Sequence, residues 1–322
     1  CGDIENEFIK SIAAGDSFSA FLSRSGRVFT CGRIPRSYPE ELDDPDLADY
    51  VPRRATTHPN NAIKDDDDDG DKRLHFYRMG NGFRHLFVQD QNTMQLYGMG
   101  ANDYGALSTD EYLSRHLSTV NCIDEVTGAT RPVAFPCKKI VAGTGFSVLL
   151  DYRGALFTSG RANDHNPSTF TLAREPFDRG VKFIDVCCTW AHFIALDTNG
   201  SASIFSLTNT QLVPLSVPGP VVQIGSGQVH LYARTSDLLY KVSDTALNNL
   251  LNPRNPTQHL ECTIWKCGEI LGSNDRSFVQ LTGSYHMSVI HQACLIESQP
   301  VALVANLNRF RKDQIMCDVT VV

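Results

Sequence analysis

Short runs of apolar residues, each followed by a polar turn, recur along the chain. The first covers residues 12–32, IAAGDSFSAFLSRSGRVFTCG, and residues 140–160, IVAGTGFSVLLDYRGALFTSG, repeat its pattern without a gap. Eight of the positions that are identical at a constant separation of 128 residues define the repeat: Gly15, Phe18, Ser19, Leu22, Gly26, Phe29, Thr30 and Gly32 return as Gly143, Phe146, Ser147, Leu150, Gly154, Phe157, Thr158 and Gly160. Identity at a fixed spacing indicates an internal repeat.

Four weaker copies begin at Met79, Cys187, Ile224 and Leu281. In each copy an apolar stretch leads into a turn of small residues, and a second apolar stretch follows. The turn is followed by an aromatic residue or histidine, which we place at Phe18, Phe83, Phe146, His192, His230 and His286. The runs are too short for a helical period, and glycine supplies the backbone angles that tight turns need. Each copy is therefore predicted to be a small antiparallel meander of three strands.

Meanders of this size leave their faces and edge strands open, and radial stacking around an axis buries the faces between neighbours. The pattern thus predicts an all-β fold, a β-propeller with degenerate blades, as one main domain over residues 1–297. Residues 264–268 are either a displaced strand of the fifth unit or a decayed repeat. A sixth unit is expected at residues 278–296.

Residues 33–73 interrupt the pattern with an acidic insertion that contains several prolines. They hold twelve acidic and seven basic residues, which accounts for most of the net charge of −7. Proline and like-charge repulsion oppose packing, so we expect a disordered surface loop. Its run of aspartates is the candidate partner-binding segment, and a solvated spacer is the alternative: Asp65, Asp66, Asp67, Asp68 and Asp69. Direct binding of nucleic acid is not expected, because that needs a concentrated basic surface.

No motif for catalysis, for a cofactor or for a metal is found, so we expect no enzyme and no cofactor. His192, His230 and His286 occupy equivalent positions in the repeat, which favours a structural role over a shared metal site. Trp190 and Trp265 are interpreted as packing residues rather than binding anchors.

The ten cysteines form no disulfide framework. A zinc site at Cys262 and Cys267 is the alternative, but no second ligand pair lies near them in sequence. The chain shows neither a signal peptide nor an apolar run long enough for a membrane span. Because it opens in mid-repeat, we interpret it as part of a longer protein. These features predict a reducing cytoplasmic or nuclear setting without membrane contact.

The Gly-x-x-His/Phe-Ser core and the Tyr/Phe-x-x-Gly strand end resemble the regulator of chromosome condensation repeat, the unit of a seven-bladed propeller. Near the end the pattern changes: LNRF at residues 307–310 and CDVTVV at residues 317–322 resemble the opening helix and first strand of a BTB (POZ) domain. This resemblance implies the truncated start of an α/β domain at residues 298–322.

Two functions follow from the resemblance. The first is a protein-interaction propeller in an adaptor whose BTB part forms a dimer and engages a cullin-type ubiquitin ligase. The alternative is a propeller that exchanges nucleotide on a Ran-like small GTPase and docks on chromatin. We favour the adaptor, since no exchange loops are matched and no basic surface is present. A scaffold without ubiquitination differs from the adaptor in no feature of the sequence.

Overall fold

The structure is a computed structural model that describes residues 4, 6–32, 53–55, 74–109, 113–161, 169–206, 209–227, 230–243, 247, 262–266, 278–283 and 288–293. These residues form small antiparallel sheets with very little helix. No helix within these ranges is long and apolar enough to cross a membrane.

Four sheets have four strands each, in chain order. The first contains β1 (Ile9–Ala14), β2 (Phe18–Ser23), β3 (Val28–Gly32) and β4 (Arg53–Arg54), and the second contains β5 (Phe76–Asn81), β6 (His85–Asp90), β7 (Leu96–Ala101) and β8 (Leu113–Thr119). The third contains β11 (Cys137–Ala142), β12 (Phe146–Asp151), β13 (Leu156–Gly160) and β14 (Thr171–Leu172), and the fourth contains β15 (Phe183–Cys188), β16 (His192–Asp197), β17 (Ala202–Ser206) and β18 (Asn209–Pro214).

A fifth unit contains β19 (Gln223–Ser226), β20 (His230–Arg234), β21 (Leu238–Ser243) and β22 (Cys262–Lys266). Its first strand also forms one parallel bridge to the hairpin of β23 (Phe278–Gly283) and β24 (Ser288–Ala293), so all six strands make one sheet. A separate hairpin, β9 (Asn121–Ile123) with β10 (Thr130–Pro132), follows the second sheet, and a short helix, α1 (Arg174–Asp178), follows the third.

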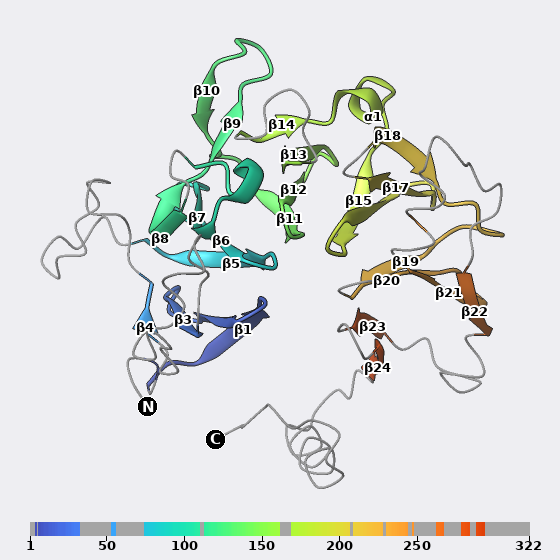
Figure 1. Ribbon diagram of the computed structural model, residues 1–322, viewed down its shortest axis with the longest axis horizontal. Helices are drawn as coiled ribbons and strands as arrows, with labels where there is room; N and C mark the ends of the chain where they lie inside the picture. The colour runs from blue at the N-terminus through green and yellow to red at the C-terminus, as the bar shows by residue number, and fades with distance from the viewer. Residues whose placement is uncertain are drawn as a thin grey trace, which may run out of the picture.

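The sheets succeed one another around a common centre (Figure 1). Their first strands β1, β5, β11, β15 and β19 lie nearest the centre and contact one another in that order. This radial arrangement is that of a β-propeller and confirms the predicted meanders. Seven blades in a closed ring remain a prediction, since parts of the chain lie outside the described residues.

The core consists of apolar layers between neighbouring sheets. The layer between the first and second sheets contains Phe18, Leu22, Leu86 and Tyr97, and the layer between the second and third contains Phe87, Ile140, Leu149 and Phe157. The layer between the third and fourth sheets contains Phe146, Leu150, Val186 and Phe193, and the layer between the fourth and fifth contains Ile194, Ile204, Ile224 and Tyr240. Strands β6, β12 and β16 are buried along their whole length. Burial on both faces explains why each strand contains consecutive apolar residues, such as Leu86, Phe87 and Val88, rather than a strict alternation of apolar and polar ones.

The fourth strands were not foreseen. Arg53 and Arg54, inside the predicted insertion, pair with Thr30 and Phe29, and β8 covers the residues that precede the third unit. Strand β22 pairs along its length with β21, so residues 264–266 form a strand of the fifth unit, whereas Cys267 and Gly268 lie outside the described residues. Strands β23 and β24 lie within the predicted sixth unit.

One side chain of β1, on the side of the first sheet that faces away from the second, is largely exposed. Ile12 is 68% exposed, whereas Ile140 and Ile224, at the equivalent positions three residues before the turn, are 6% and 5% exposed. Ile140 packs on the preceding sheet, because a Cβ at Gly80 would lie 2.6 Å from it. Figure 1 shows β1 and the β23–β24 hairpin on opposite sides of a gap, with no described strand between them.

Candidate binding face

The turns that follow the inner strands form one face of the molecule, which we call the turn face. Its described parts are residues 15–17, 82–84, 143–145 and 189–191. In each turn the first residue's N–H donates to the carbonyl of the residue three positions on, from Gly15 to Phe18 (2.9 Å) and from Gly143 to Phe146 (3.0 Å). At Gly15 a Cβ would lie 2.0 Å from the Phe18 ring, so a larger residue there would require this ring to move.

In the second unit this geometry corrects the predicted turn residue. The Gly82 N–H donates to the carbonyl of His85 (2.8 Å), and β6 begins at His85. His85, not Phe83, is therefore equivalent to Phe18, Phe146, His192 and His230. Two glycines, Gly80 and Gly82, stand close together, and the chain turns at the second.

Backbone hydrogen bonds join consecutive turns. The Asp16 N–H donates to the Phe83 carbonyl (2.8 Å), and the Phe83 N–H donates to the Gly143 carbonyl (3.3 Å). The Thr144 N–H donates in turn to the Trp190 carbonyl (3.1 Å). Because these bonds involve only main-chain atoms, they fix the turns while leaving the side chains available for contacts.

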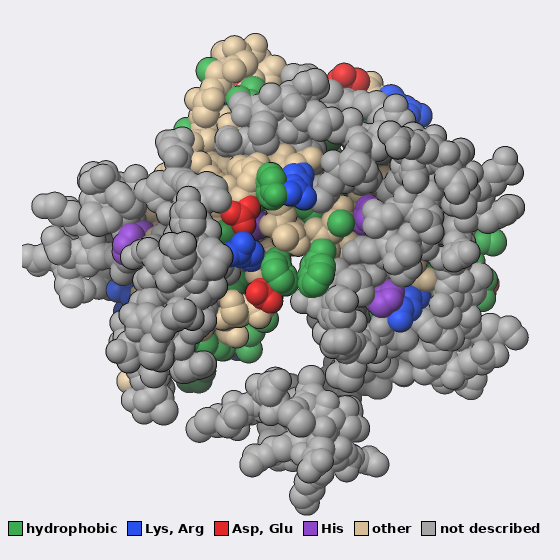
Figure 2. Space-filling view, viewed as in Figure 1, with side chains coloured by type: hydrophobic (Ala, Val, Ile, Leu, Met, Phe, Trp, Pro, Cys, Tyr) green, Lys and Arg blue, Asp and Glu red, His purple; other side chains and the backbone are tan. Residues whose placement is uncertain are grey.

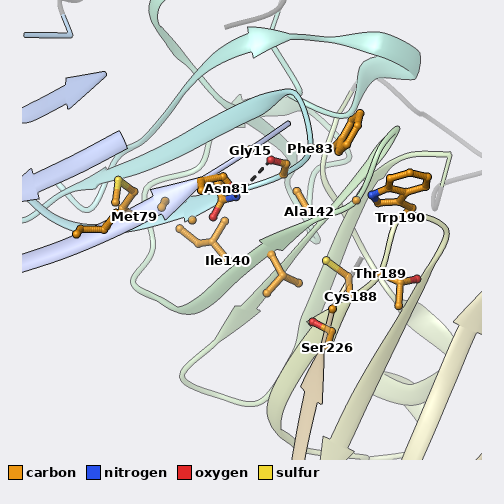
Figure 3. A pocket seen from close by; sticks show the side chains of 18 of the residues that line it. Gly15, Met79, Asn81, Phe83, Ile140, Ala142, Cys188, Thr189, Trp190 and Ser226 are labelled. Carbon is orange, nitrogen blue, oxygen red and sulfur yellow. Dashed lines mark hydrogen bonds between the residues drawn. The ribbon is translucent and has the colours of Figure 1, made fainter. Parts of the chain in front are cut away.

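A cavity of about 380 Å³ lies between the inner strands and opens among these turns. Figure 3 shows Met79, Ile140 and Ala142 along its wall and Phe83 and Trp190 near one end. The Phe83 and Trp190 rings pack edge to face with centroids 5.2 Å apart. Asn81 Nδ2 donates to the Ala14 carbonyl (2.6 Å), which links the first two sheets along the cavity.

An exposed stack of two side chains lies against the turn of residues 143–145. The guanidinium carbon of Arg161 lies 3.5 Å from the centroid of the Tyr104 ring, and Tyr104 is 56% exposed. Tyr104 has φ 59° and ψ 17°, in the left-handed region that a bulky residue seldom adopts. Its ring lies over Gly145, where a Cβ would be 2.8 Å from Tyr104 Cδ2.

The turn that carries Tyr104 is held by its own polar network. It belongs to η4 (Asp103–Gly105), a 3-10 turn after β7. Asp103 pairs with Arg84 of the turn face (3.0 Å), and Asn102 accepts from the Leu107 N–H (2.8 Å) while donating to the Thr109 carbonyl (3.0 Å). These contacts fix a backbone conformation that costs on the order of 1–3 kcal/mol by itself.

The side chains of the turn face are of mixed character. In Figure 2, which looks onto the face where η4 lies, hydrophobic, basic and acidic side chains gather around the centre. Exposed Asp16, the Arg84–Asp103 pair and the Arg161–Tyr104 stack contribute both signs of charge. Aromatic residues and arginine are the types most enriched at the energetic centres of protein interfaces.

Below the surface, His85 links the second and third sheets. Its side chain is buried, its Nε2 lies 2.8 Å from Ser147 Oγ, and burial lowers its pKa to about 4. A neutral imidazole at this position is a structural group. His192 and His230 begin β16 and β20 in the same way, as the repeat predicts.

Other sequence-predicted residues lie outside the described part of the chain. These are Asp65, Asp66, Asp67, Asp68, Asp69, His286, Cys267 and all of residues 298–322. Trp190, interpreted as a packing residue, does pack against Phe83, but it also lines the opening of the cavity. In the described ranges no three His, Cys, Asp or Glu side chains are grouped as metal ligands would be.

Sequence reasoning missed Tyr104, Arg161 and Arg84. The turn signal around Tyr104 was visible in GMGANDYGALS, residues 98–108. It predicts a loop, but nothing in the sequence pairs that loop with a residue 57 positions later.

Comparisons with known proteins agree with this architecture. Residues 9–33 match the model of the regulator of chromosome condensation (RCC1) repeat. No curated protein sequence matches the chain. Prp20p from Saccharomyces cerevisiae, in a structure described with its binding properties to Gsp1p and histones, is similar with a TM-score of 0.58 and 12% identity, over 94% of this chain and 72% of that one.

Two further structures are similar. Yeast RCC1 (Prp20) bound to Kap60 gives a TM-score of 0.58 at 12% identity, over 96% of this chain and 70% of that one. Human WBSCR16 gives 0.50 at 14% identity, and there this chain spans 58% of the other chain's length. At such identities the likeness concerns the fold. The chain thus carries an RCC1 repeat at residues 9–33 and has the fold of an RCC1-like β-propeller.

Proposed function

We propose that this chain is a protein-interaction module that binds its partner on the turn face and holds it without catalysing a reaction. The observation that carries the proposal is the stack of Arg161 on Tyr104, which is exposed and rests on a strained backbone. A strained, exposed aromatic residue adds little to the core, whereas pre-positioned aromatic and arginine side chains lower the entropic cost of binding.

The test compares two substitutions of the same kind. Arg161→Gln removes the cation of the turn face, and Arg24→Gln removes an exposed cation beyond the far end of β2. We expect a partner of the purified full-length protein to bind the first variant at least tenfold more weakly and the second unchanged. A partner that is lost with Arg24→Gln but not with Arg161→Gln would place the interface elsewhere. Recovery of the bound partner without covalent change, by mass spectrometry, tests the absence of catalysis.

A second candidate function is action on a Ran-like small GTPase or on histones. It is favoured by the fold shared with Prp20p, whose structure is described together with binding to Gsp1p and histones. The test is the rate of GDP release from Ran with and without the purified chain. Acceleration that Arg161→Gln abolishes would support exchange at the turn face, and an unchanged rate would leave histone binding, measured separately, as the remaining form of this candidate.

The adaptor function remains a proposal that depends on residues 298–322. Its test is co-precipitation of the full-length protein with a cullin scaffold, and measurement of its oligomeric state by light scattering. Absence of both association and dimer would contradict it.

We also propose a reducing compartment, the cytoplasm or nucleus. The proposal is supported by Cys122, Cys137 and Cys187, which are buried free thiols. Imaging of the tagged full-length protein in cells tests it, and secretion of the protein would contradict it.

A further inference from the structure

The Arg161 side chain is an exposed cation with one face already occupied. Its guanidinium carbon lies 3.5 Å from the centre of the Tyr104 ring, so the ring covers one side of the cation. It forms no ion pair with any residue in the described part of the chain. Neighbouring Asp103 does not neutralise it, because Arg84 occupies that carboxylate at 3.0 Å.

The stack lies on the turn of residues 143–145, and Gly143 of this turn lines the cavity. Gly145 supports the Tyr104 ring, and the preceding residue, Thr144, donates its N–H to the Trp190 carbonyl at 3.1 Å. The cation is therefore separated by one short turn from Trp190. The Trp190 ring packs on Phe83, and Figure 3 shows both of these side chains at the cavity. A single short segment of a partner can reach both the cation and this aromatic pair.

From this geometry we propose that Arg161, positioned by Tyr104, is the anchor for an aspartate or glutamate side chain of a partner protein. The same partner segment carries a large apolar side chain that enters the opening beside Phe83 and Trp190. A planar guanidinium binds a carboxylate through two parallel hydrogen bonds, and stacking on Tyr104 holds it ready for this geometry. The inference rests on the proposed function and names the chemistry of the partner.

The left-handed backbone conformation of Tyr104 allows its role in binding to be tested apart from any role in stability. Glycine adopts φ 59° without strain, so Tyr104→Gly removes the stack while relieving the backbone. We expect this variant to unfold at a denaturant concentration no lower than that of the wild type. If Tyr104 were only a packing residue, its loss would lower the midpoint.

The binding probe is a library of random twelve-residue peptides displayed on phage and selected on the intact 322-residue chain. We expect the selected peptides to share an acidic residue close to a large apolar one. Their affinity should fall at least tenfold with Arg161→Gln and with Tyr104→Gly, and should not change with Arg24→Gln. Replacement of the peptide's acid by its amide should cost nothing further once Arg161 is replaced, because both changes remove the same contact.

The outcomes distinguish the carboxylate anchor at Arg161 from partner binding on the turn face in general. Peptides that lose affinity with Trp190→Ala but keep it with Arg161→Gln would overturn the carboxylate anchor and leave binding on the turn face intact. Peptides indifferent to every turn-face substitution, or a selection without binders, would overturn both. A phosphoserine in place of the acid that binds more than tenfold tighter, again through Arg161, would assign phosphate to the site and overturn the carboxylate.

Discussion

Acid should loosen the contact between the second and third sheets through His85. This imidazole is buried, lies 2.8 Å from Ser147 Oγ, and packs edge to face on Phe87 at 5.4 Å. Burial lowers its pKa from 6.5 to about 4. Between these values the unfolded chain binds a proton that the folded protein excludes, so the contribution to stability is complete above pH 6.5 and is lost as the pH falls towards 4.

The size of the effect follows from the shift. Each pKa unit corresponds to about 1.4 kcal/mol, so the free energy of unfolding should fall by about 3 kcal/mol in total. About 2 kcal/mol of this is lost between pH 7 and pH 5, because the unfolded state is then almost fully protonated at this residue.

The perturbation is the double substitution His85→Phe with Ser147→Ala. Phenylalanine occupies the equivalent positions Phe18 and Phe146, and the second change avoids leaving a buried hydroxyl without its partner. Urea unfolding at pH 5, 6 and 7 gives the free energy for the wild type and the variant, and their difference removes the contribution of other titrating groups.

We expect that difference to change by about 2 kcal/mol between pH 7 and pH 5 in favour of the variant. Ser147→Ala alone is the control, because it keeps the buried imidazole and should keep the pH dependence. Parallel profiles for wild type and double variant, with equal denaturant slopes, would show that His85 is not excluded from protonation and would refute the reasoning.

Three further predictions concern stability and thiol chemistry. Gly160→Ala should lower the free energy of unfolding in urea by about 3 kcal/mol or more, because φ is +73° and a Cβ would lie 2.3 Å from a backbone oxygen. The control is Gly128→Ala, which has a similar φ of +69° but open space around it and should lower this free energy by only about 1 kcal/mol. Equal losses for the two variants would contradict the prediction. Asp197→Ala should lower the free energy of unfolding by about 2–3 kcal/mol, because the buried carboxylate accepts two backbone N–H bonds of 2.8 Å in its hairpin; an unchanged thermal midpoint would refute this. Burial raises the pKa of Cys122 to about 11 and the pKa of Cys137 to about 12. Mass spectrometry should therefore find neither thiol labelled by iodoacetamide at pH 8 until guanidinium unfolds the protein. Rapid labelling of the folded protein would be inconsistent with their burial.

The repeat made the strands predictable because its signal is local. Glycines indicate the turns, and the apolar runs between them indicate the strands. The positive φ of Gly26, Gly154 and Gly200 agrees with their positions in hairpin turns. The turn at Gly82 was misplaced by two residues, because Gly80 offered an equally permissive backbone in sequence.

The fourth strands were hidden for a different reason. Arg53 and Arg54 join the first sheet through main-chain hydrogen bonds, which need no apolar pattern. The candidate site was hidden because its parts come from separate units. Tyr104 and Arg161 meet across the second and third sheets, and a contact between two loops leaves no periodic trace in one sequence.

The main-chain hydrogen bonds that join consecutive turns affect how the turn face can change during evolution. Asp16, Phe83 and Thr144 each give their amide hydrogen to the neighbouring unit, whatever side chain they carry. Substitution at these positions can therefore exchange one set of exposed side chains for another while the three main-chain hydrogen bonds are kept. Main-chain atoms join the turns, whereas side chains are available to contact partners. Binding specificity can therefore change during evolution without a change in the fold.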